Sequence, residues 1–381
     1  INAKFQQRVQ QILEQNYGSA GISYSTGCYA VVMNPYTGAI YAMAGIDRNP
    51  ETGKQTTDQI GAINHPITMG SVVKAATVMG GFMSHAITPE NNTMTDQPIV
   101  TGGMQKSSWF NKKGGANMSL TAPEALEVSS NSYMMQIAMR EGGMDYHSGA
   151  KLTLKPSIFK KERYYFNMFG LGEKTGIDLP GEVKGYEGPT TYKHIGNALD
   201  EAYGNYDGYT VLQLAQYMST IANGGYRMQP YIVQAVRGTN PNGTLGRVAY
   251  EHQPVIQLAV PASKAYFDLV HEGLYLVVHG SNAYVTGKQL AKSDISISGK
   301  TGTAETYYKK HNTVTLSFAG YAPSDHPQVV VALAIPGSTD DDGGPNMTMA
   351  SEIFKAYFKD VQSEKGGSSN IGSLSMANAA N

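Results

Sequence analysis

Apolar residues recur along this chain with the spacing of helices in some stretches and of strands in others. Near the start, four apolar positions lie on one helical face and predict a helix over residues 2–16: Phe5, Val9, Ile12 and Leu13. Two apolar runs follow at 28–33 and 39–44, separated by a turn sequence with proline and glycine at 34–38. We therefore expect an N-terminal helix followed by a β-hairpin.

The middle of the chain has mainly helical patterning. Four stretches have a helical period and predict helices: about 71–83, 119–140, 209–223 and 262–279. The second opens with the capping residues Thr121 and Glu124, and four small polar residues at 129–132 interrupt it. We therefore expect two short helices with a break between them. Residues 141–207 are rich in glycine, proline, tyrosine and lysine and predict loops over a few short elements.

Three further strands and a last helix complete the predicted order. The strands are expected at 294–304, 313–321 and 328–336, and the helix from about 347 to 358. Pairing of the early hairpin with the late strands predicts an α+β fold, in which an antiparallel sheet of about five strands is flanked by the N- and C-terminal helices. A second, mainly helical lobe then faces the sheet across a cleft that holds the active site.

We expect one domain over residues 1–362, divided into two lobes. The sheet lobe comprises about 1–60 and 290–362, and the helical lobe comprises about 61–289. The remaining residues, 363–381, are mostly glycine, serine, asparagine and alanine, and they predict a disordered tail.

Composition excludes several classes of function. The 381 residues carry a net charge of −1, which gives no indication of a nucleic-acid partner. The single cysteine, Cys28, excludes an intramolecular disulfide, and no apolar run approaches the ~20 residues of a membrane helix. The histidines show no metal-ligand spacing and no nucleotide-binding motif is present, so we expect neither a metal nor a cofactor.

The chain begins at Ile1 without a signal pattern, and we expect it to be a fragment of a longer protein.

A candidate nucleophile lies at the start of the predicted 71–83 helix, in the sequence Ser71-Val72-Val73-Lys74. Residues at i and i+3 lie on one helical face, so the Ser71 hydroxyl and the Lys74 amine are expected to meet. A neutral amine can remove the proton that keeps a serine hydroxyl a poor nucleophile. The S-x-x-K pattern also occurs at 148–151 and 157–160, so other motifs have to select among the three copies.

Two other motifs complete a candidate site. Ser129-x-Asn131 lies at the predicted helix break, and Lys300-Thr301-Gly302-Thr303 lies at the end of a predicted strand. Second copies occur at 368–370, in the predicted tail, and at 174–176, in a predicted loop. Chain order and the helix and strand contexts together select the copies at 71, 129 and 300. Two alternatives stay open: Ser129 and Asn131 cap a helix, or Lys300 is a solvated strand end.

The three motifs in this order resemble those of the penicillin-recognising serine acyltransferases, S-x-x-K, S-D-N and K-T-G. The resemblance covers nearly the whole chain up to about residue 360 and is closest to the transpeptidase domain of class B penicillin-binding proteins. Within that class, the sequences at 71–76 and 129–131 are similar to those of the Gram-positive 2b type. Other supporting stretches are 34–43, 176–182, 213–217, 221–225 and 300–305.

The resemblance implies a role for each catalytic residue. Ser71 attacks the carbonyl of a D-Ala-D-Ala peptide bond and becomes an acyl-enzyme, while Lys74 accepts its proton. Lys74 must be neutral for this step, and Lys300 is the neighbouring cation that lowers its pKa. Ser129 relays a proton to the leaving amine, and Asn131 binds the substrate backbone and holds Lys74.

The resemblance also implies how the substrate is held. The hydroxyls of Thr301 and Thr303, with the charge of Lys300, bind the terminal carboxylate of the peptide. Gly302 allows the substrate to approach the strand edge, where it pairs as an added strand. The backbone N–H groups of Ser71 and Thr303 form the oxyanion hole.

The implied protein is a peptidoglycan D,D-transpeptidase with stem peptides as donor and amine acceptor and with β-lactams as covalent inhibitors. It is expected to be anchored in the cell membrane, on the extracytoplasmic face, and to meet membrane cell-wall synthesis proteins through an N-terminal region that this chain lacks. Four alternatives stay open: a β-lactamase, a D,D-carboxypeptidase, a β-lactam-sensing receptor domain and a structural module. Against the first, the stretch nearest to the deacylation motif E-x-x-L-N, at 162–167, has the wrong spacing and no leucine.

Overall fold

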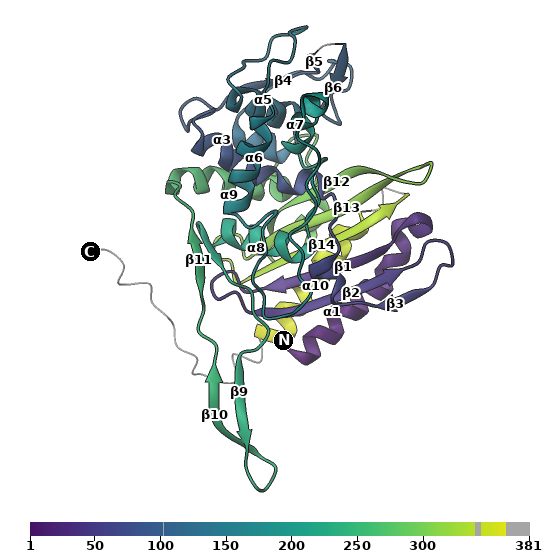
Figure 1. Ribbon diagram of the computed structural model, residues 1–381, viewed down its shortest axis with the longest axis vertical. Helices are drawn as coiled ribbons and strands as arrows, with labels where there is room; N and C mark the ends of the chain where they lie inside the picture. The colour runs from purple at the N-terminus through teal and green to yellow at the C-terminus, as the bar shows by residue number, and fades with distance from the viewer. Residues whose placement is uncertain (102, 340–343, 363–381) are drawn as a thin grey trace, which may run out of the picture.

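A six-stranded antiparallel sheet forms the centre of the molecule. The computed structural model describes residues 1–101, 103–339 and 344–362, and Figure 1 shows their arrangement. The strands of this sheet are β1 (Gly27–Met33), β2 (Ile40–Arg48), β3 (Gln55–Thr57), β12 (Ser298–Tyr308), β13 (His311–Ala322) and β14 (Val329–Ser338). Their order is β12-β13-β14-β1-β2-β3, so the N-terminal hairpin pairs with the late strands through β1 and β14, as expected.

Strand β1 explains why the sheet has helices on both faces. All seven of its residues are buried, and they alternate between two core clusters. The even-numbered residues, from Cys28 to Val32, pack with the helices α1 (Ala3–Asn16) and α10 (Pro345–Tyr357). The odd-numbered residues, from Tyr29 to Met33, pack in the cluster that contains α8 (Val211–Ala222). A strand covered on both faces has an uninterrupted apolar sequence, which is the pattern found at 28–33.

The polypeptide between β3 and β12 supplies the rest of the described fold. Its other helices are α2 (Gly61–Asn64), α3 (Lys74–Met83), α4 (Ala122–Glu127), α5 (Asn131–Glu141), α6 (Ser157–Met168), α7 (Ala198–Glu201) and α9 (Lys264–His279). Its short strands pair as β4 (Met94–Asp96) with β7 (Met118–Leu120), β5 (Ile99–Thr101) with β6 (Met104–Lys106), β8 (Tyr226–Met228) with β11 (Ile256–Ala259), and β9 (Ala235–Thr239) with β10 (Leu245–Glu251). The last pair projects from the body as an arm (Figure 1).

The expected α+β class is confirmed, with α1 and α10 on one face of the sheet (Figure 1). The sheet has one strand more than expected, because the three residues of β3 are exposed and carry no apolar pattern. The expectation of loops with short elements over 141–207 is wrong for α6, a regular helix of 12 residues. Glycine- and proline-rich sequence on both sides hid its buried positions: Ile158, Phe159, Glu162 and Phe166.

The predicted tail at 363–381 lies outside the described residues, and the division into two lobes stays a prediction. In the described part of the chain, no helix combines the length and the apolar character that crossing a bilayer requires.

Glu162 is a buried acid in the middle of α6. Its side chain is 4% exposed, and neither carboxyl oxygen has a hydrogen-bond partner among the described residues. Burial, followed by the nearby carboxylates Glu201, Glu141 and Asp207, holds its pKa well above the ordinary value. The folded protein therefore keeps a proton on Glu162 that the unfolded chain releases above about pH 4.3, and the stability of the fold falls as the pH rises from there.

We predict that Glu162→Met raises the free energy of unfolding by roughly 1–3 kcal/mol at pH 8, because an unpaired polar group leaves the core. The gain should be smaller at pH 5, where the unfolded chain is closer to being protonated at this position. Urea unfolding at both pH values measures the difference, with Glu90→Met at an exposed position as the control. An equal gain at the two pH values would contradict the raised pKa.

Candidate active site

Ser71 lies in a 3₁₀ turn and not in the α-helix expected from the sequence. The turn η3 (Gly70–Val73) precedes α3, which begins at Lys74, and the Lys74 backbone N–H donates to the Ser71 carbonyl. Side chains at i and i+3 of a 3₁₀ turn eclipse each other, so Ser71 and Lys74 project from the same side. The Ser71 hydroxyl makes no hydrogen bond to a described residue, so the expected direct contact with Lys74 is not present.

Main-chain hydrogen bonds hold the segment that leads to Ser71. Ile67 exchanges two of them with Tyr209, at 2.8 and 2.9 Å, and the Gly70 N–H donates to the Gly204 carbonyl at 2.8 Å. Gly70 has φ 65°, a left-handed conformation that suits glycine. Ser71 is therefore presented from a backbone that is fixed on its N-terminal side.

Strand β12 packs directly against this segment at Gly302. A Cβ atom on Gly302 would lie 2.1 Å from Ser317 Oγ and 2.5 Å from the Met69 carbonyl oxygen, and Ser317 Oγ donates to that same oxygen at 2.7 Å. A Cβ atom on Gly70 would lie 2.5 Å from the Thr303 carbonyl oxygen. Glycine at 302 thus allows the K-T-G strand to contact the S-x-x-K turn, while its expected role toward the substrate stays a prediction.

Lys74 is fully buried and reaches the turn between α4 and α5. Its Nζ donates to the Ser129 carbonyl oxygen at 2.7 Å and to Asn131 Oδ1 at 2.6 Å, and it lies 3.1 Å from Ser129 Oγ. The two carbonyl-type acceptors take up both N–H groups of a neutral amine. The lone pair of such an amine is then available to a hydroxyl proton.

Lys300 reaches the same hydroxyl from β12. Its Nζ lies 2.9 Å from Ser129 Oγ and 3.1 Å from the Thr301 carbonyl oxygen, and its side chain is 0% exposed. Burial lowers the pKa of Lys300 to about 7. Burial, and then the neighbouring Lys300, lower the pKa of Lys74 well below its ordinary value, while Asp96 opposes this shift. The alternative of a solvated strand end is therefore wrong for Lys300.

The turn at Ser129 has the strained geometry that places its hydroxyl between the two lysines. Ser129 has φ 57°, an uncommon conformation for a residue with a side chain. The cap of α5 is Ser130, whose Oγ accepts a hydrogen bond from the Tyr133 N–H at 2.9 Å. The expected break between two helices is confirmed, and because Ser130 provides the cap, the side chains of Ser129 and Asn131 face Lys74.

Polar residues outside the three motifs support this turn. Asp96 is fully buried and accepts hydrogen bonds from Ser130 Oγ, Ser108 Oγ and Asn111 Nδ2. Thr301, one of the expected substrate-binding residues, donates from its hydroxyl to Thr286 Oγ1 at 2.8 Å. Asp96, Ser108, Asn111 and Thr286 come from loops and a short strand without repeats or motifs, so no sequence pattern pointed to them.

The surface beside Thr301 is open and partly aromatic. Thr303 is exposed, and β12 lies at the edge of the described sheet, where its outer side has no strand neighbour. Phe110 and Tyr284 stack with ring centroids 4.6 Å apart, and the half-exposed Trp109 donates from its indole N–H to the Val128 carbonyl. The loop that carries Tyr284 also carries Thr286, whose hydroxyl accepts the hydrogen bond of Thr301.

The second copies of the motifs do not form sites. The S-x-x-K residues at 148, 151, 157 and 160 are exposed, and none of them makes a side-chain hydrogen bond to a described residue. In the loop copy of K-T-G, the Thr175 hydroxyl and N–H donate to Glu182 and stabilise the loop itself. The copy at 368–370 lies outside the described residues.

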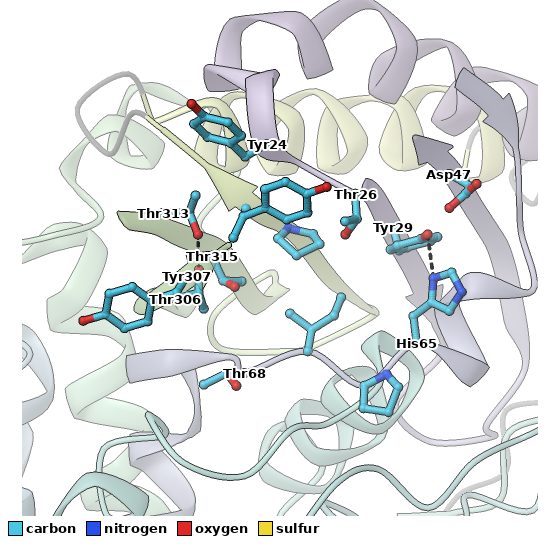
Figure 2. Close-up of a pocket in the computed structure, with 15 residues that line it drawn as sticks. Tyr24, Thr26, Tyr29, Asp47, His65, Thr68, Thr306, Tyr307, Thr313 and Thr315 are labelled. Carbon is cyan, nitrogen blue, oxygen red and sulfur yellow. Dashed lines mark hydrogen bonds between the residues drawn. The ribbon is translucent and has the colours of Figure 1, made fainter. Parts of the chain in front are cut away.

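A hollow of about 450 Å³ lies on the sheet near the segment that leads to Ser71 (Figure 2). Residues 65–68 form one side, where a ring nitrogen of His65 is 2.7 Å from the Tyr29 hydroxyl, and Thr306 lies on the β12 side. None of the expected catalytic side chains lines this hollow. Among the described residues no cluster of three histidine, cysteine, aspartate or glutamate side chains has a geometry that could hold a metal.

The fold and the three motifs are those typical of the penicillin-recognising serine acyltransferases. Residues 28–359 match the family model described as the penicillin binding protein transpeptidase domain, and the chain belongs to this family. It is 39% identical to penicillin-binding protein 2B of Streptococcus pneumoniae, over 94% of this chain and 54% of that protein. It is 37% identical to penicillin-binding protein H of Bacillus subtilis, over 94% of this chain and 50% of that protein. The chain thus spans about half the length of the curated relatives it matches.

Solved structures agree with these sequence relationships. Penicillin-binding protein 2B from S. pneumoniae strain R6 superposes with a TM-score of 0.90 at 38% identity, covering 94% of this chain and 59% of that chain. The expected resemblance to the transpeptidase domain of class B proteins, of the 2b type, is confirmed.

We predict that Gly302→Ala destabilises the fold by roughly 1–3 kcal/mol, because the added methyl overlaps Ser317 Oγ and the Met69 carbonyl. Urea unfolding measures the loss. Gly115→Ala is the matched control, since its added methyl meets no atom within 4 Å. Wild-type stability in Gly302→Ala would show that β12 and the nucleophile turn do not pack as closely as described.

Proposed function

We propose that this chain is the catalytic domain of a peptidoglycan D,D-transpeptidase that works through an acyl-enzyme on Ser71. The observation that carries the proposal is the convergence of two fully buried lysines, Lys74 and Lys300, on the hydroxyl of Ser129. Ser71 lies one 3₁₀ turn before Lys74, so its hydroxyl adjoins the two buried lysines. This hydroxyl has no hydrogen-bond partner among the described residues.

In the acylation step, Ser71 Oγ bonds to the carbonyl carbon of the D-Ala-D-Ala bond and its proton passes to neutral Lys74. The low pKa of Lys74 supports this role, because a base must be unprotonated at the working pH. The bond from that carbon to the leaving nitrogen then breaks. Ser129 Oγ passes its proton to the nitrogen and takes up the proton held by Lys74, whose Nζ lies 3.1 Å away. Lys300, on the other side of Ser129, favours proton release from this hydroxyl.

Substrate binding is proposed along the open edge of β12. The donor peptide pairs as an added strand, and its terminal carboxylate lies against Lys300, Thr301 and Thr303. The backbone N–H groups of Ser71 and Thr303 stabilise the oxyanion, a type of donor pair whose single members contribute about 3–4 kcal/mol in the transition state. The contact of Gly302 and Gly70 with the facing backbones supports this arrangement, because it brings the Ser71 turn and β12 together.

The acceptor in the second step is proposed to be the amine of another stem peptide. It attacks the acyl carbon, the Ser71 ester bond breaks, and Ser71 Oγ regains a proton from the attacking nitrogen.

In the described part of the chain, the carboxylate that acts on Lys74 is Asp96, and its oxygens already accept three side-chain hydrogen bonds. Glu162, in the stretch nearest to a deacylation motif, interacts with Glu201, Glu141 and Asp207 instead.

This arrangement favours slow deacylation by water over a β-lactamase activity. Among the described residues, the carboxylate that acts on Lys74, Asp96, is already engaged in hydrogen bonds and is not free to act as a base for water. A D,D-carboxypeptidase or a β-lactam-sensing receptor domain would share the acylation step, and turnover with an added amine separates them from a transpeptidase. A structural module would not be acylated.

β-Lactams are proposed as covalent inhibitors of this site. A penicillin-binding protein 3 of Mycobacterium tuberculosis, which shares the fold at 21% identity and a TM-score of 0.71, was solved in complex with ampicillin. Anchoring in the cell membrane on its extracytoplasmic face, and partners among the membrane cell-wall synthesis proteins, are further parts of the proposal that follow from the family.

We predict that a labelled penicillin adds one acyl group to this protein and that Ser71→Ala abolishes the adduct. Intact mass and peptide mapping measure it, and Ser148→Ala and Ser157→Ala, at the exposed copies of the motif, should keep the adduct. An adduct that persists in Ser71→Ala, or rapid steady hydrolysis of the penicillin, would refute the proposed function.

A further inference from the structure

Asp96 is a buried carboxylate beneath the catalytic turn, at the end of β4. Its side chain is 0% exposed, and no lysine, arginine or histidine forms an ion pair with it among the described residues. Its Oδ2 accepts from the hydroxyls of Ser108 and Ser130, both at 2.5 Å, and its Oδ1 accepts from Asn111 Nδ2 at 3.0 Å. A buried aspartate without an ion pair is costly, so one that has only neutral donors is expected to have a function.

The two hydroxyls connect Asp96 to the backbone of the catalytic turn. Ser108 Oγ accepts hydrogen bonds from the Asn131 N–H at 2.9 Å and from the Ser132 N–H at 3.2 Å. Ser130 Oγ accepts from the Tyr133 N–H, which makes it the cap of α5.

Each hydroxyl therefore has one hydrogen left to donate, and both hydrogens go to the same oxygen of Asp96. An ionised carboxylate, which only accepts, satisfies all of these donors at once. Through Ser108 and Ser130, Asp96 thus holds the backbone of the turn that carries Ser129.

Asp96 also acts on the catalytic lysines through its charge. The charged groups that act on Lys74 are Lys300, from β12, and Asp96, from β4. Lys300 lowers the pKa of Lys74, and Asp96 raises it. One group therefore both orients the turn and opposes the shift that burial and Lys300 produce.

We propose that Asp96 is a positioning residue for acyl transfer: through Ser108 and Ser130 it fixes the 129–132 backbone so that the Ser129 hydroxyl stays between Lys74 and Lys300. This inference rests on the proposed function, since the turn it fixes belongs to the same site. None of the three sequence motifs includes Asp96.

The test is Asp96→Asn, with the rate of acylation by a fluorescent penicillin followed by stopped flow from pH 5 to 10. We expect the plateau rate to fall roughly tenfold, as for loss of a hydrogen bond to a charged group, with the dissociation constant of the initial complex little changed. The acid limb of the profile should move to lower pH, because Lys74 loses the charge that favours its protonation. A merely structural role for Asp96 would not move this limb.

The matched control is Asp145→Asn, which removes an aspartate charge in the same part of the chain. Asp145 follows α5, is 73% exposed and pairs with Arg140, so both the plateau and the acid limb should be those of the wild type. An Asp96→Asn protein with a wild-type plateau and acid limb would overturn the proposal.

Ser108→Ala decides the question if Asp96→Asn does not fold. It keeps the charge of Asp96 but removes the acceptor of the Asn131 and Ser132 N–H groups. We expect a lower plateau without a downward shift of the acid limb, and faster hydrogen exchange at these two amides. Wild-type acylation and exchange in Ser108→Ala would overturn the proposal.

The outcomes for the wild type separate the two proposals. A wild-type protein that forms no adduct on Ser71 refutes the proposed function. Hydrogen exchange at Asn131 and Ser132 in the unacylated protein still tests whether Ser108 and Asp96 hold the turn.

Discussion

The burial of two lysine side chains against one serine hydroxyl is the constraint on which the rest of this site depends. Lys74 and Lys300 are both fully buried, and their amines lie 3.1 and 2.9 Å from Ser129 Oγ. Two positive charges this close are strongly disfavoured away from water, so the pair gives up a proton more readily than exposed lysines do. A neutral amine beside a serine is the base that acyl transfer needs, and here burial, and then the neighbouring Lys300, lower the pKa of Lys74.

Several features of the fold bury the two lysines and hold their geometry constant. Glycine at 302 and at 70 lets strand β12 contact the nucleophile turn, which brings Lys300 to Lys74. A left-handed residue, Ser129, turns the chain between α4 and α5 so that its hydroxyl faces both amines. Strain of this kind persists only where the surroundings hold it, and Ser130 and Asp96 are the groups that do so.

Much of the fold follows from local patterns. The capping residues Thr121 and Glu124 and the small polar residues at 129–132 predicted two helices with a break, which are α4 and α5. The apolar runs of the early hairpin and of the late strands predicted the antiparallel sheet. Patterns failed where an element has no apolar period, as in β3, or where neighbouring glycines and prolines dominate the composition, as around α6.

The sequence by itself determined the identity and order of the reactive groups: the S-x-x-K, S-x-N and K-T-G motifs, each in its helix, turn or strand. Only the tertiary structure decided the downward shift in the pKa of Lys74, the left-handed turn at Ser129 and the hydrogen bonds of Asp96. The physical reason is that a pKa depends on burial and on the charges nearby, and both come from residues distant in the chain. Asp96 and Lys300 are separated by most of the sequence, yet they act on the same amine.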